Sequence, residues 1–476
     1  MSEKELYKWY IYPSIEIQWD EVLDKKNLQE EIDSIISNET VDNEKRIDDI
    51  LSNNIENKEI NEKIDNIYDN SLKNYEFLLE EQFEWVNNED LKEKSLLIQI
   101  PFSHSVWFIT KLIEKINNSN SILSKIKVDY FILNTNTINN HKENPEKIEK
   151  LYWDYIKRIE KSDKFIEIKD TTVPYNQYTN TDDLSKNILT NEKKFMDSMF
   201  NLSNPRLKTY FPTKLQAEEA GLEYKEFVDI WNSAMTLDIK IIKEANKELI
   251  EKLEKYEYIN IKWNNWTHIT FWVKDKYWDN SYWKTNQPWA EVFTVPHRDQ
   301  VNWTIIFEEK NIIKMFWKDD NRVIENLKLE FERWELIEIS INKKWKLSEI
   351  EKEQLKKLKK IIFTENLDNR FLWEIAFWTT PQIKAGSILH PLAAEKASGS
   401  HIALWKCYTR EWKGKIMDNG NNNADFHWDL IWSMKKYIIT WKKENWDIEI
   451  IMNKWNFSKN VAPKLDKYKN SIKRKK

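Results

Sequence analysis

The sequence predicts an α/β N-terminal domain followed by an α+β, strand-rich C-terminal domain. Three observations lead to this fold class. The chain has 476 residues, which is more than one hydrophobic core usually organises. Residues 91–255 alternate β-branched, apolar runs with helical patterns. In residues 256–476, apolar and polar residues alternate in runs that turn at short polar links. Residues 1–90 are expected to form a helical N-terminal extension, because patterns such as LQEEIDSIISN are amphipathic at helical spacing.

The α/β domain is expected from strand-type runs separated by helical segments. Ser95 to Ile100 and Lys127 to Asn134 are rich in β-branched and aromatic residues, and Val106 to Asn117 between them has a helical pattern. A further helix is expected from Lys147 to Lys161. This alternation is typical of parallel strands joined by helices.

The middle of the chain is expected to be helical. One helical region is predicted for residues 183–210, and two amphipathic helices are predicted in residues 218–238 and 239–260, where apolar residues recur at spacings of three and four. We place a domain boundary near residue 255. Beyond it, alternating runs predict strands in residues 259–275, 302–317, 321–341 and 435–453.

Composition excludes several classes of protein. Lys and Arg number 74 against 79 Asp and Glu, so the net charge is only −5, which argues against a general polyanion binder. The single cysteine, Cys407, cannot form an internal disulfide, and the first residues lack the apolar core of a signal peptide. The most apolar run, Leu96 to Ile113, is interrupted by polar residues and is too short to span a membrane. We therefore expect a cytoplasmic protein with no nucleic-acid or membrane partner.

Tryptophan is abundant in this chain and glycine is scarce. There are 5 glycines and 25 tryptophans, whereas glycine normally makes up roughly 7% of a protein. Several tryptophans stand in turn-like positions: Trp263 and Trp266 flank two asparagines, and Trp446 lies in Glu-Asn-Trp-Asp. Our hypothesis is that the source organism reads one stop-type codon as glycine, which is rendered here as tryptophan. The alternative is a carbohydrate binder with stacking platforms, but such platforms do not gather in tight polar turns.

Four stretches of the C-terminal part place candidate metal ligands next to a tryptophan that we interpret as glycine. They are NQPWAEVFTVPHRD (Trp289, Glu291), FLWEIAF (Trp373, Glu374), HPLAAEKASGSHIALWKCY (Glu395, His401, Trp405, Tyr408) and DFHWD (His427, Trp428, Asp429). The seven-residue spacing of His401 and Tyr408 equals two turns of an α-helix, and His427 and Asp429 would share one face of a strand. Taken singly, each residue could equally be a core histidine or a solvated carboxylate.

Together and in this order, the four stretches resemble the thermophilic metalloprotease family of dinuclear-metal aminopeptidases, of the aminopeptidase T, aminopeptidase S and PepS type. With glycine restored, NQPGAEVFTVPHRDQVNGTIIF resembles the family's Pro-x-Gly-Glu-Val-Phe-Thr-x-Pro stretch. GSHIALGKCY resembles its His-Ile-Ala-x-Gly-x-x-Tyr helix, and the resemblance extends to residues 212–238. It covers the chain from about residue 90 to about residue 460.

The resemblance implies two divalent metal ions, and residue chemistry limits which ions these are. The implied ligands are Glu291, Glu374, His401, His427 and Asp429, and the implied catalytic residues are Glu374, Tyr408 and Glu395. Carboxylate and imidazole ligands favour Zn, Co or Mn over metals that need thiolates. Two ions ~3.5–4 Å apart can share a water, lower its pKa and polarise a scissile carbonyl. Glu374 or Glu395 would accept the proton, and Tyr408 would stabilise the oxyanion.

The implied activity is removal of N-terminal residues from peptides with a free N-terminus by a metal-activated water, in a cytoplasmic homodimer. Two other functions remain open: a catalytically inactive peptide-binding homologue, and a dinuclear metal esterase or phosphoesterase. Glu395 lies one residue further from His401 than the family pattern has it, so it is either a ligand or a group behind the ligands. His297, Arg298 and Asp299 have no nucleophilic serine beside them, and we interpret them as structural or as supports of the ligands.

Overall fold

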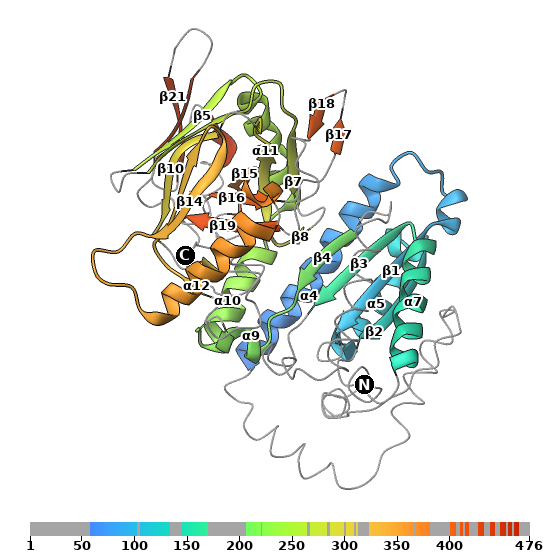
Figure 1. The fold of residues 1–476 in the computed structure, drawn as a ribbon. Helices are drawn as coiled ribbons and strands as arrows, with labels where there is room; N and C mark the ends of the chain where they lie inside the picture. Colours follow the sequence, from blue (N-terminus) through green and yellow to red (C-terminus); the bar gives the residue numbers. More distant parts are fainter. Residues whose placement is uncertain are drawn as a thin grey trace. The chain divides into compact units, whose positions relative to one another are not determined.

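The computed structural model divides into two compact units, the first formed by Met1–Gln216 with Glu223–Thr236 and the second by Ala217–Leu222 with Leu237–Lys476 (Figure 1). Helix α11 (Ile239–Leu253) therefore belongs to the second unit, although the boundary predicted from the sequence lies after it, near residue 255. The structure describes residues 58–101, 105–133, 145–169, 206–219, 221–263, 267–282, 286–298, 301–308, 311–312, 323–365, 367–380, 400–405, 410–412, 415–417, 427–432, 438–442, 448–453, 456–458 and 461–465.

The first unit is built on a parallel sheet. Its strands are β1 (Ser95–Pro101), β2 (Lys127–Leu133), β3 (Lys164–Lys169) and β4 (Arg206–Tyr210), in the order β2-β1-β3-β4. The two strands and the parallel pairing that the sequence predicts for residues 95–134 are confirmed. The prediction of helix for residues 206–210 is wrong. Leu207 and Thr209 alternate with less buried residues and are fully buried, so this short segment pairs with β3 as a strand.

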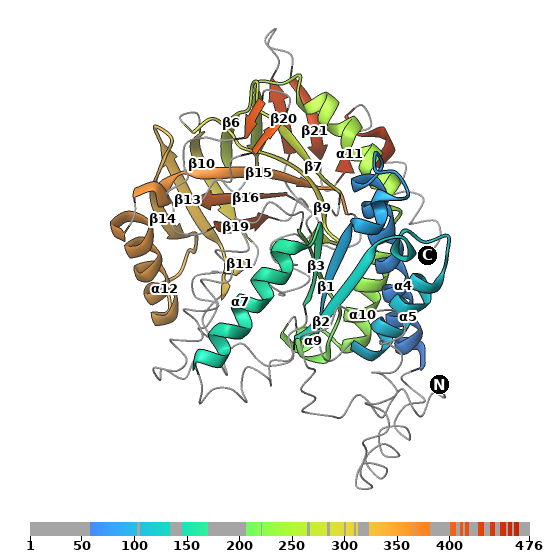
Figure 2. The ribbon, with the colours of Figure 1, turned by 90° about the vertical axis from the view of Figure 1, so that its right-hand side faces the viewer.

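Helices cover both faces of this sheet. Figure 2 shows α7 on one face and α4, α5 and α10 on the other. Since β2 and β3 lie on opposite sides of β1, right-handed connections place α5 and α7 on opposite faces. The helices and short helical turns of this unit are α4 (Lys58–Gln82), η3 (Asp90–Glu93), α5 (Ser105–Asn117), η5 (Ile122–Ser124), α7 (Pro145–Lys161) and α10 (Tyr224–Met235), and α9 (Lys214–Glu219) crosses the limit between the units.

The second unit is strand-rich, as the alternating patterns predict, and its described strands form antiparallel sheets of eight and five strands and two sheets of two strands. The larger sheet has the order β14-β13-β10-β6-β5-β20-β21-β22. Its strands are β5 (Tyr258–Lys262), β6 (His268–Trp272), β10 (Val301–Phe307), β13 (Leu327–Glu332), β14 (Glu335–Ile341), β20 (Ile438–Lys442), β21 (Ile448–Asn453) and β22 (Asn456–Phe457).

The smaller sheet has the order β19-β16-β15-β9-β7. Its strands are β7 (Trp278–Tyr282), β9 (Ala290–Thr294), β15 (Leu372–Trp378), β16 (Ser400–Trp405) and β19 (His427–Trp432). The remaining elements of the unit are the strands β8 (Asn286–Gln287), β11 (Asn311–Ile312), β12 (Val323–Ile324), β17 (Arg410–Trp412) and β18 (Lys415–Met417), helix α12 (Glu349–Lys360), a π-helical turn (Ile361–Glu365) and a 3₁₀ turn (Leu367–Arg370).

One face of the five-stranded sheet belongs to the main hydrophobic core. Val292 of β9, Ile375 of β15 and Ile402 of β16 pack in the same buried cluster as Ile259 of β5 and Ile305 of β10 in the larger sheet. Helix α11 adds Ala245, Leu249 and Leu253 to that cluster. Since side chains alternate along a strand, the residues between these core positions point to the other face, which carries the candidate site.

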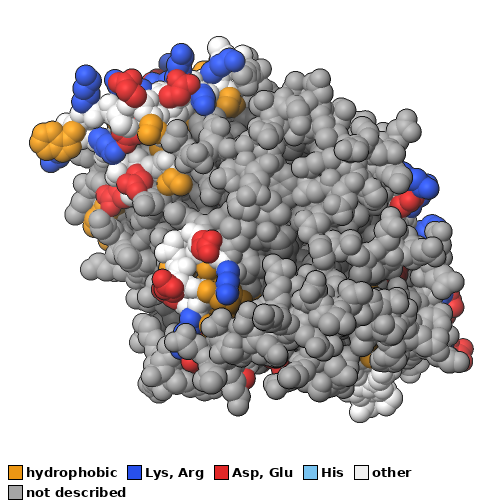
Figure 3. Space-filling view, turned by 90° about the horizontal axis from the view of Figure 1, so that it is seen from below, with side chains coloured by type: hydrophobic (Ala, Val, Ile, Leu, Met, Phe, Trp, Pro, Cys, Tyr) orange, Lys and Arg blue, Asp and Glu red, His pale blue; other side chains and the backbone are white. Residues whose placement is uncertain are grey.

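The surface carries charges of both signs. In the view of Figure 3, described Lys and Arg side chains are interspersed with Asp and Glu. Surface pairs such as Lys127 with Glu93 and Lys359 with Glu338 have the same mixed character. This mixing agrees with the small net charge of the chain. In the described part of the chain, no helix has the length and apolar character needed to cross a bilayer.

Candidate metal centre

Glu291 lies in β9, a strand whose five residues are all buried. Glu291 as a whole is only 4% exposed. Its neighbour Val292 points into the main core, so strand alternation directs Glu291 to the opposite face. Asn246 of α11 reinforces this position, because its Nδ2 donates to the Glu291 carbonyl oxygen at 3.5 Å and to Asn280 Oδ1 at 3.0 Å.

Glu374 lies on β15, the strand next to β9, and His401 lies on β16, the strand beyond β15. Strand β15 pairs with β9 on one side and with β16 on the other. Opposite Glu374 in the register stands Ala403, and opposite His401 stands Ala376. Both functional side chains are almost completely buried, at 4% exposure for Glu374 and 1% for His401. Three residues that are far apart in the sequence are therefore brought to one sheet face by strand register.

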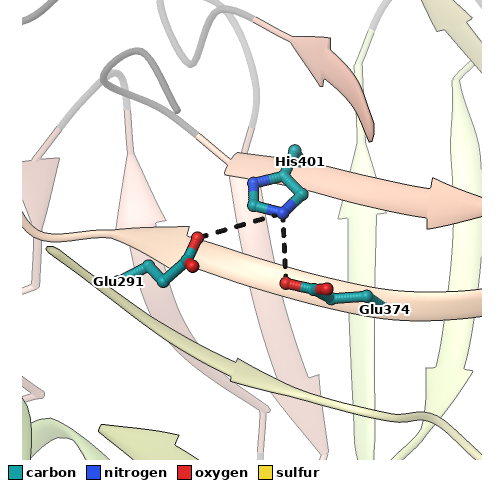
Figure 4. A group of neighbouring side chains, drawn as sticks. All are labelled: Glu291, Glu374 and His401. Atoms are coloured by element: carbon teal, nitrogen blue, oxygen red, sulfur yellow. Dashed lines mark hydrogen bonds and ion pairs between the residues drawn. The ribbon is translucent and has the colours of Figure 1, made fainter. Parts of the chain in front are cut away.

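The three side chains converge on one point (Figure 4). His401 Nε2 lies 3.1 Å from Glu374 Oε1 and 3.9 Å from Glu291 Oε2. The ligand atoms of these three residues all lie within 4.8 Å of one another. Asp429 of β19 joins them, with its Oδ1 3.5 Å from His401 Nε2. Four of the predicted metal ligands therefore lie together.

The charges in this cluster need a cation. Glu291, Glu374 and Asp429 surround a single imidazole, so even a protonated His401 leaves the four side chains with a net charge of −2 (three negative charges and one positive). Burying an ion costs several kcal/mol unless it is compensated. The donor set of one imidazole and several carboxylates suits Zn, Co or Mn. The residues present therefore fit divalent metal ions.

Small side chains stand beside the ligands. Ala376 and Ala403 lie on the same sheet face as Glu374 and His401, and both are fully buried. They pack with Phe293 and Val295 in a small cluster separate from the main core. An alanine on each central strand lets carboxylates from neighbouring strands approach a common ion.

The backbone around His401 differs from the prediction. The sequence resemblance places His401 and Tyr408 on one helix, but residues 400–405 form strand β16. Ile402 and Leu404 fill the main core while His401 and Ala403 face the site, and the segment pairs with strands on both sides. This two-residue alternation with two partner strands leaves no room for a helix in this segment. Tyr408 and Glu395 lie outside the described residues.

Strand geometry is confirmed for the pair His427 and Asp429. Both belong to β19, where His427 pairs with Trp405 and Asp429 pairs with Ala403. The side chain of His427 lies outside the described part of the structure, so its role as a ligand stays a prediction. Trp428, between them, is completely buried in the main core on the other face. Its indole is therefore directed away from the ligands.

Sequence reasoning missed Trp378, whose indole contacts the far side of the His401 ring. Its indole Nε1 lies 2.7 Å from His401 Nδ1, and the two rings meet edge to face with centroids 5.6 Å apart. Trp378 is four residues after Glu374 on the same strand, so the period of two could have placed both on one face. Trp378 contacts His401 because β15 pairs with β16, and no local sequence pattern predicts that pairing.

The other candidates near Glu291 in the sequence have structural contacts. His297 Nε2 lies 2.8 Å from the Lys274 carbonyl oxygen, and its ring stacks on Trp272 with centroids 4.4 Å apart. The guanidinium of Arg298 lies 3.6 Å from the centre of the Phe371 ring. Asp299 is outside the described residues. These contacts agree with the structural interpretation of His297 and Arg298.

Comparisons with known proteins agree with this geometry. The family model described as thermophilic metalloprotease (M29) matches residues 91–457. Among solved structures, wild-type AmpT from Thermus thermophilus is similar with a TM-score of 0.57 and 15% identity, over 80% of this chain and 99% of that one. The structure of 2,5-dihydroxypyridine dioxygenase from Pseudomonas putida KT2440 matches with a TM-score of 0.46 and 11% identity, over 83% of this chain and 98% of that one. No curated protein matches. The family model spans most of the chain, and the chain therefore belongs to the thermophilic metalloprotease (M29) family of peptide-bond hydrolases.

Proposed function

We propose that this protein is a metal-dependent aminopeptidase that removes N-terminal residues from peptides. The observation that carries the proposal is the buried cluster of Glu291, Glu374 and His401, whose ligand atoms lie within 4.8 Å of one another in a chain of a metalloprotease family. Family membership supports hydrolysis of peptide bonds with divalent metal. The cluster provides the donor atoms that such chemistry needs.

Glu291, His401 and Asp429 are the proposed holders of the metal. Their donor atoms face one another from the strands β9, β16 and β19. His427 is proposed as a further ligand, because it precedes Asp429 by two positions on the same strand. Divalent ions held here would supply Lewis-acid polarisation of the scissile carbonyl and would lower the pKa of a bound water.

Glu374 is the proposed proton acceptor in addition to a ligand. Its Oε1 lies within hydrogen-bond distance of His401 Nε2, so the carboxylate is already oriented toward the cluster. A carboxylate within hydrogen-bond reach of the reacting groups can act as a general base. Glu395 is proposed as an alternative acceptor and Tyr408 as a donor to the oxyanion, on the sequence resemblance alone.

Preference for a free N-terminus is proposed on the resemblance of the motifs to aminopeptidases. Two Zn, Co or Mn ions, a homodimeric assembly and a cytoplasmic location are proposed on the same resemblance.

The test uses amino-acyl reporter substrates with the full-length protein. We expect release of the reporter that a chelator abolishes and that added Zn, Co or Mn restores. A blocked N-terminus on the same reporter should prevent release, which separates an aminopeptidase from an endopeptidase. If only acyl-ester or phosphoester reporters are cleaved, the site is a metal esterase or phosphoesterase. If peptides bind but no reporter is cleaved under any metal condition, the protein is a non-catalytic binder, and the proposal fails in both cases.

A further inference from the structure

The turn between β13 and β14 has a backbone that suits glycine. Arg333 and Trp334 are the two residues between these strands, and their φ angles are +47° and +79°. Glu332 and Glu335 close the hairpin as its last pair. Two successive positive φ angles in a two-residue hairpin define a type I′ turn, for which Asn-Gly and Asp-Gly are preferred. Tryptophan at the second position conflicts with this backbone.

A second tryptophan has the same conflict inside a strand. Trp303 of β10 has a φ angle of +87° and pairs with Ile269 on one side and Phe331 on the other. Its side chain is 51% exposed, so no burial in the core explains the unusual backbone. Glycine in a strand interior commonly marks such a local distortion. The other described residues with positive φ include Asp275 and Asn326, whose side chains tolerate it, and Gly221.

At the metal centre, the hydrogen bond from Trp378 to His401 conflicts with metal binding by His401. An indole nitrogen is a donor only, so the 2.7 Å contact requires a lone pair on His401 Nδ1. A neutral imidazole has one lone pair, and its proton must then be on Nε2, the nitrogen that faces Glu374, Glu291 and Asp429. In that tautomer Nε2 cannot bind a metal ion.

Trp231 shows the opposite situation, because both its indole N–H and its ring make favourable contacts. It is completely buried in α10, and its indole Nε1 donates to the Tyr210 carbonyl oxygen at 2.8 Å. Its ring stacks on Phe227 with centroids 4.7 Å apart. This environment requires a large aromatic donor, and a glycine in the middle of this helix would destabilise it.

We propose that the protein as its own cell makes it carries glycine at positions 303, 334 and 378 and tryptophan at 231, and that glycine at 378 frees His401 Nδ1. With the indole absent, Nδ1 can carry the proton and Nε2 can donate its lone pair to a divalent ion. The backbone evidence at 303 and 334 is independent of the metal centre. The part that concerns position 378 rests on the proposed function.

Peptide mapping by mass spectrometry tests the decoding. The protein is purified from its own cells and digested, and the peptides that contain positions 231, 303, 334 and 378 are sequenced. The expected result is glycine at the last three positions and tryptophan at 231. Tryptophan at 303, 334 and 378 would overturn the proposal.

Metal titration tests the consequence for the site. We compare Zn²⁺ binding by calorimetry for the chain as printed and for its W378G and W378F variants, since phenylalanine keeps a ring but lacks the N–H. Both variants should bind about ten- to hundredfold more tightly than the parent, the range expected when a group behind a metal ligand changes. A parent that binds as tightly as W378G refutes the role of position 378 and leaves the metal centre standing. If no variant binds Zn²⁺, Co²⁺ or Mn²⁺, the proposed function fails as well.

Thermal unfolding keeps the backbone argument separate from metal binding. The double variant W303G/W334G should melt about 2–4 °C higher than the parent in the presence of chelator, because two strained positions are relieved. A lower melting temperature for this double variant would contradict glycine at these positions, whatever the metal titration shows.

Discussion

Replacing Trp334 with glycine should stabilise the second unit, although it deletes a large side chain. A bulky residue in the left-handed region costs about 1–2 kcal/mol, and Trp334 has a φ of +79°. Glycine offsets about 0.5–1 kcal/mol of this gain, because the unfolded chain is more flexible at a glycine and loses more entropy on folding. Since Trp334 is 38% exposed, its indole makes fewer packing contacts than a buried tryptophan, and its removal costs less. The net gain is about 0.5 kcal/mol, or roughly 1–2 °C in melting temperature for a unit of this size.

The matched control is the same substitution at Trp231. Truncating a buried tryptophan costs about 3–5 kcal/mol, and glycine in a helix interior adds about 1 kcal/mol. The Tyr210 carbonyl oxygen also loses its indole donor. Circular dichroism melts of W334G and W231G should therefore move in opposite directions. If W334G melts several degrees below the parent, the strain argument for this turn is wrong.

Three other substitutions test the site and one helix end. The E291Q variant keeps the shape of Glu291 but removes its charge, so it should lose bound metal and activity together while its melting temperature in chelator stays close to that of the parent. Metal content by plasma mass spectrometry checks this, and full activity would contradict the ligand assignment. In the A403L variant, a larger side chain stands between Glu374 and Asp429, the partners of Ala403 in the strand register. It should abolish metal binding and lower the stability by about 1–3 kcal/mol through overpacking. The control is I402L on the core face, which should bind metal normally. At α12, the hydrogen bond from Lys343 lowers the pKa of Glu351, the backbone and side chain of Ser348 lower it further, and burial opposes them. A carboxylate whose pKa is lowered by folding stabilises the protein at pH values above its unfolded pKa, and this stabilisation is lost as the pH falls through its folded pKa. Below pH 4.5, the melting temperature should therefore fall more steeply with pH for the parent than for E351Q. Equal slopes would contradict this role.

Periodicity predicted many of the regular elements but not the short strand of residues 206–210. The amphipathic spacing of residues 239–253 and the alternation of residues 327–341 identify a helix and a hairpin because each pattern repeats over several turns or residue pairs. Residues 206–210 were mistaken for helix. Five residues offer too few repeats to distinguish the two periods, and only the pairing of this segment with β3 determines its structure.

The ligands could be selected from the sequence only through a resemblance to known motifs. Glu291, Glu374 and His401 meet because three strands from distant segments are adjacent in one sheet, and no local pattern encodes that adjacency. The same resemblance misled on the backbone of His401, which was expected on a helix and lies on a strand. The alternation of Ile402 and Leu404 with His401 and Ala403 was a local signal for the strand, and it outweighs the seven-residue spacing to Tyr408.

Composition alone could count the excess tryptophans but could not say which of them replace glycine. The positive φ angles at 303 and 334 identify two positions from the backbone, and the donor on His401 Nδ1 identifies a third from hydrogen-bond chemistry. Trp231 meets neither criterion, since its φ is not positive and its indole donates to a backbone carbonyl oxygen. The codon reassignment that we propose would therefore have consequences of two kinds in this protein. At hairpins and strands it would determine backbone strain, and at position 378 it would determine whether the only histidine in the described cluster can present a lone pair to a metal ion.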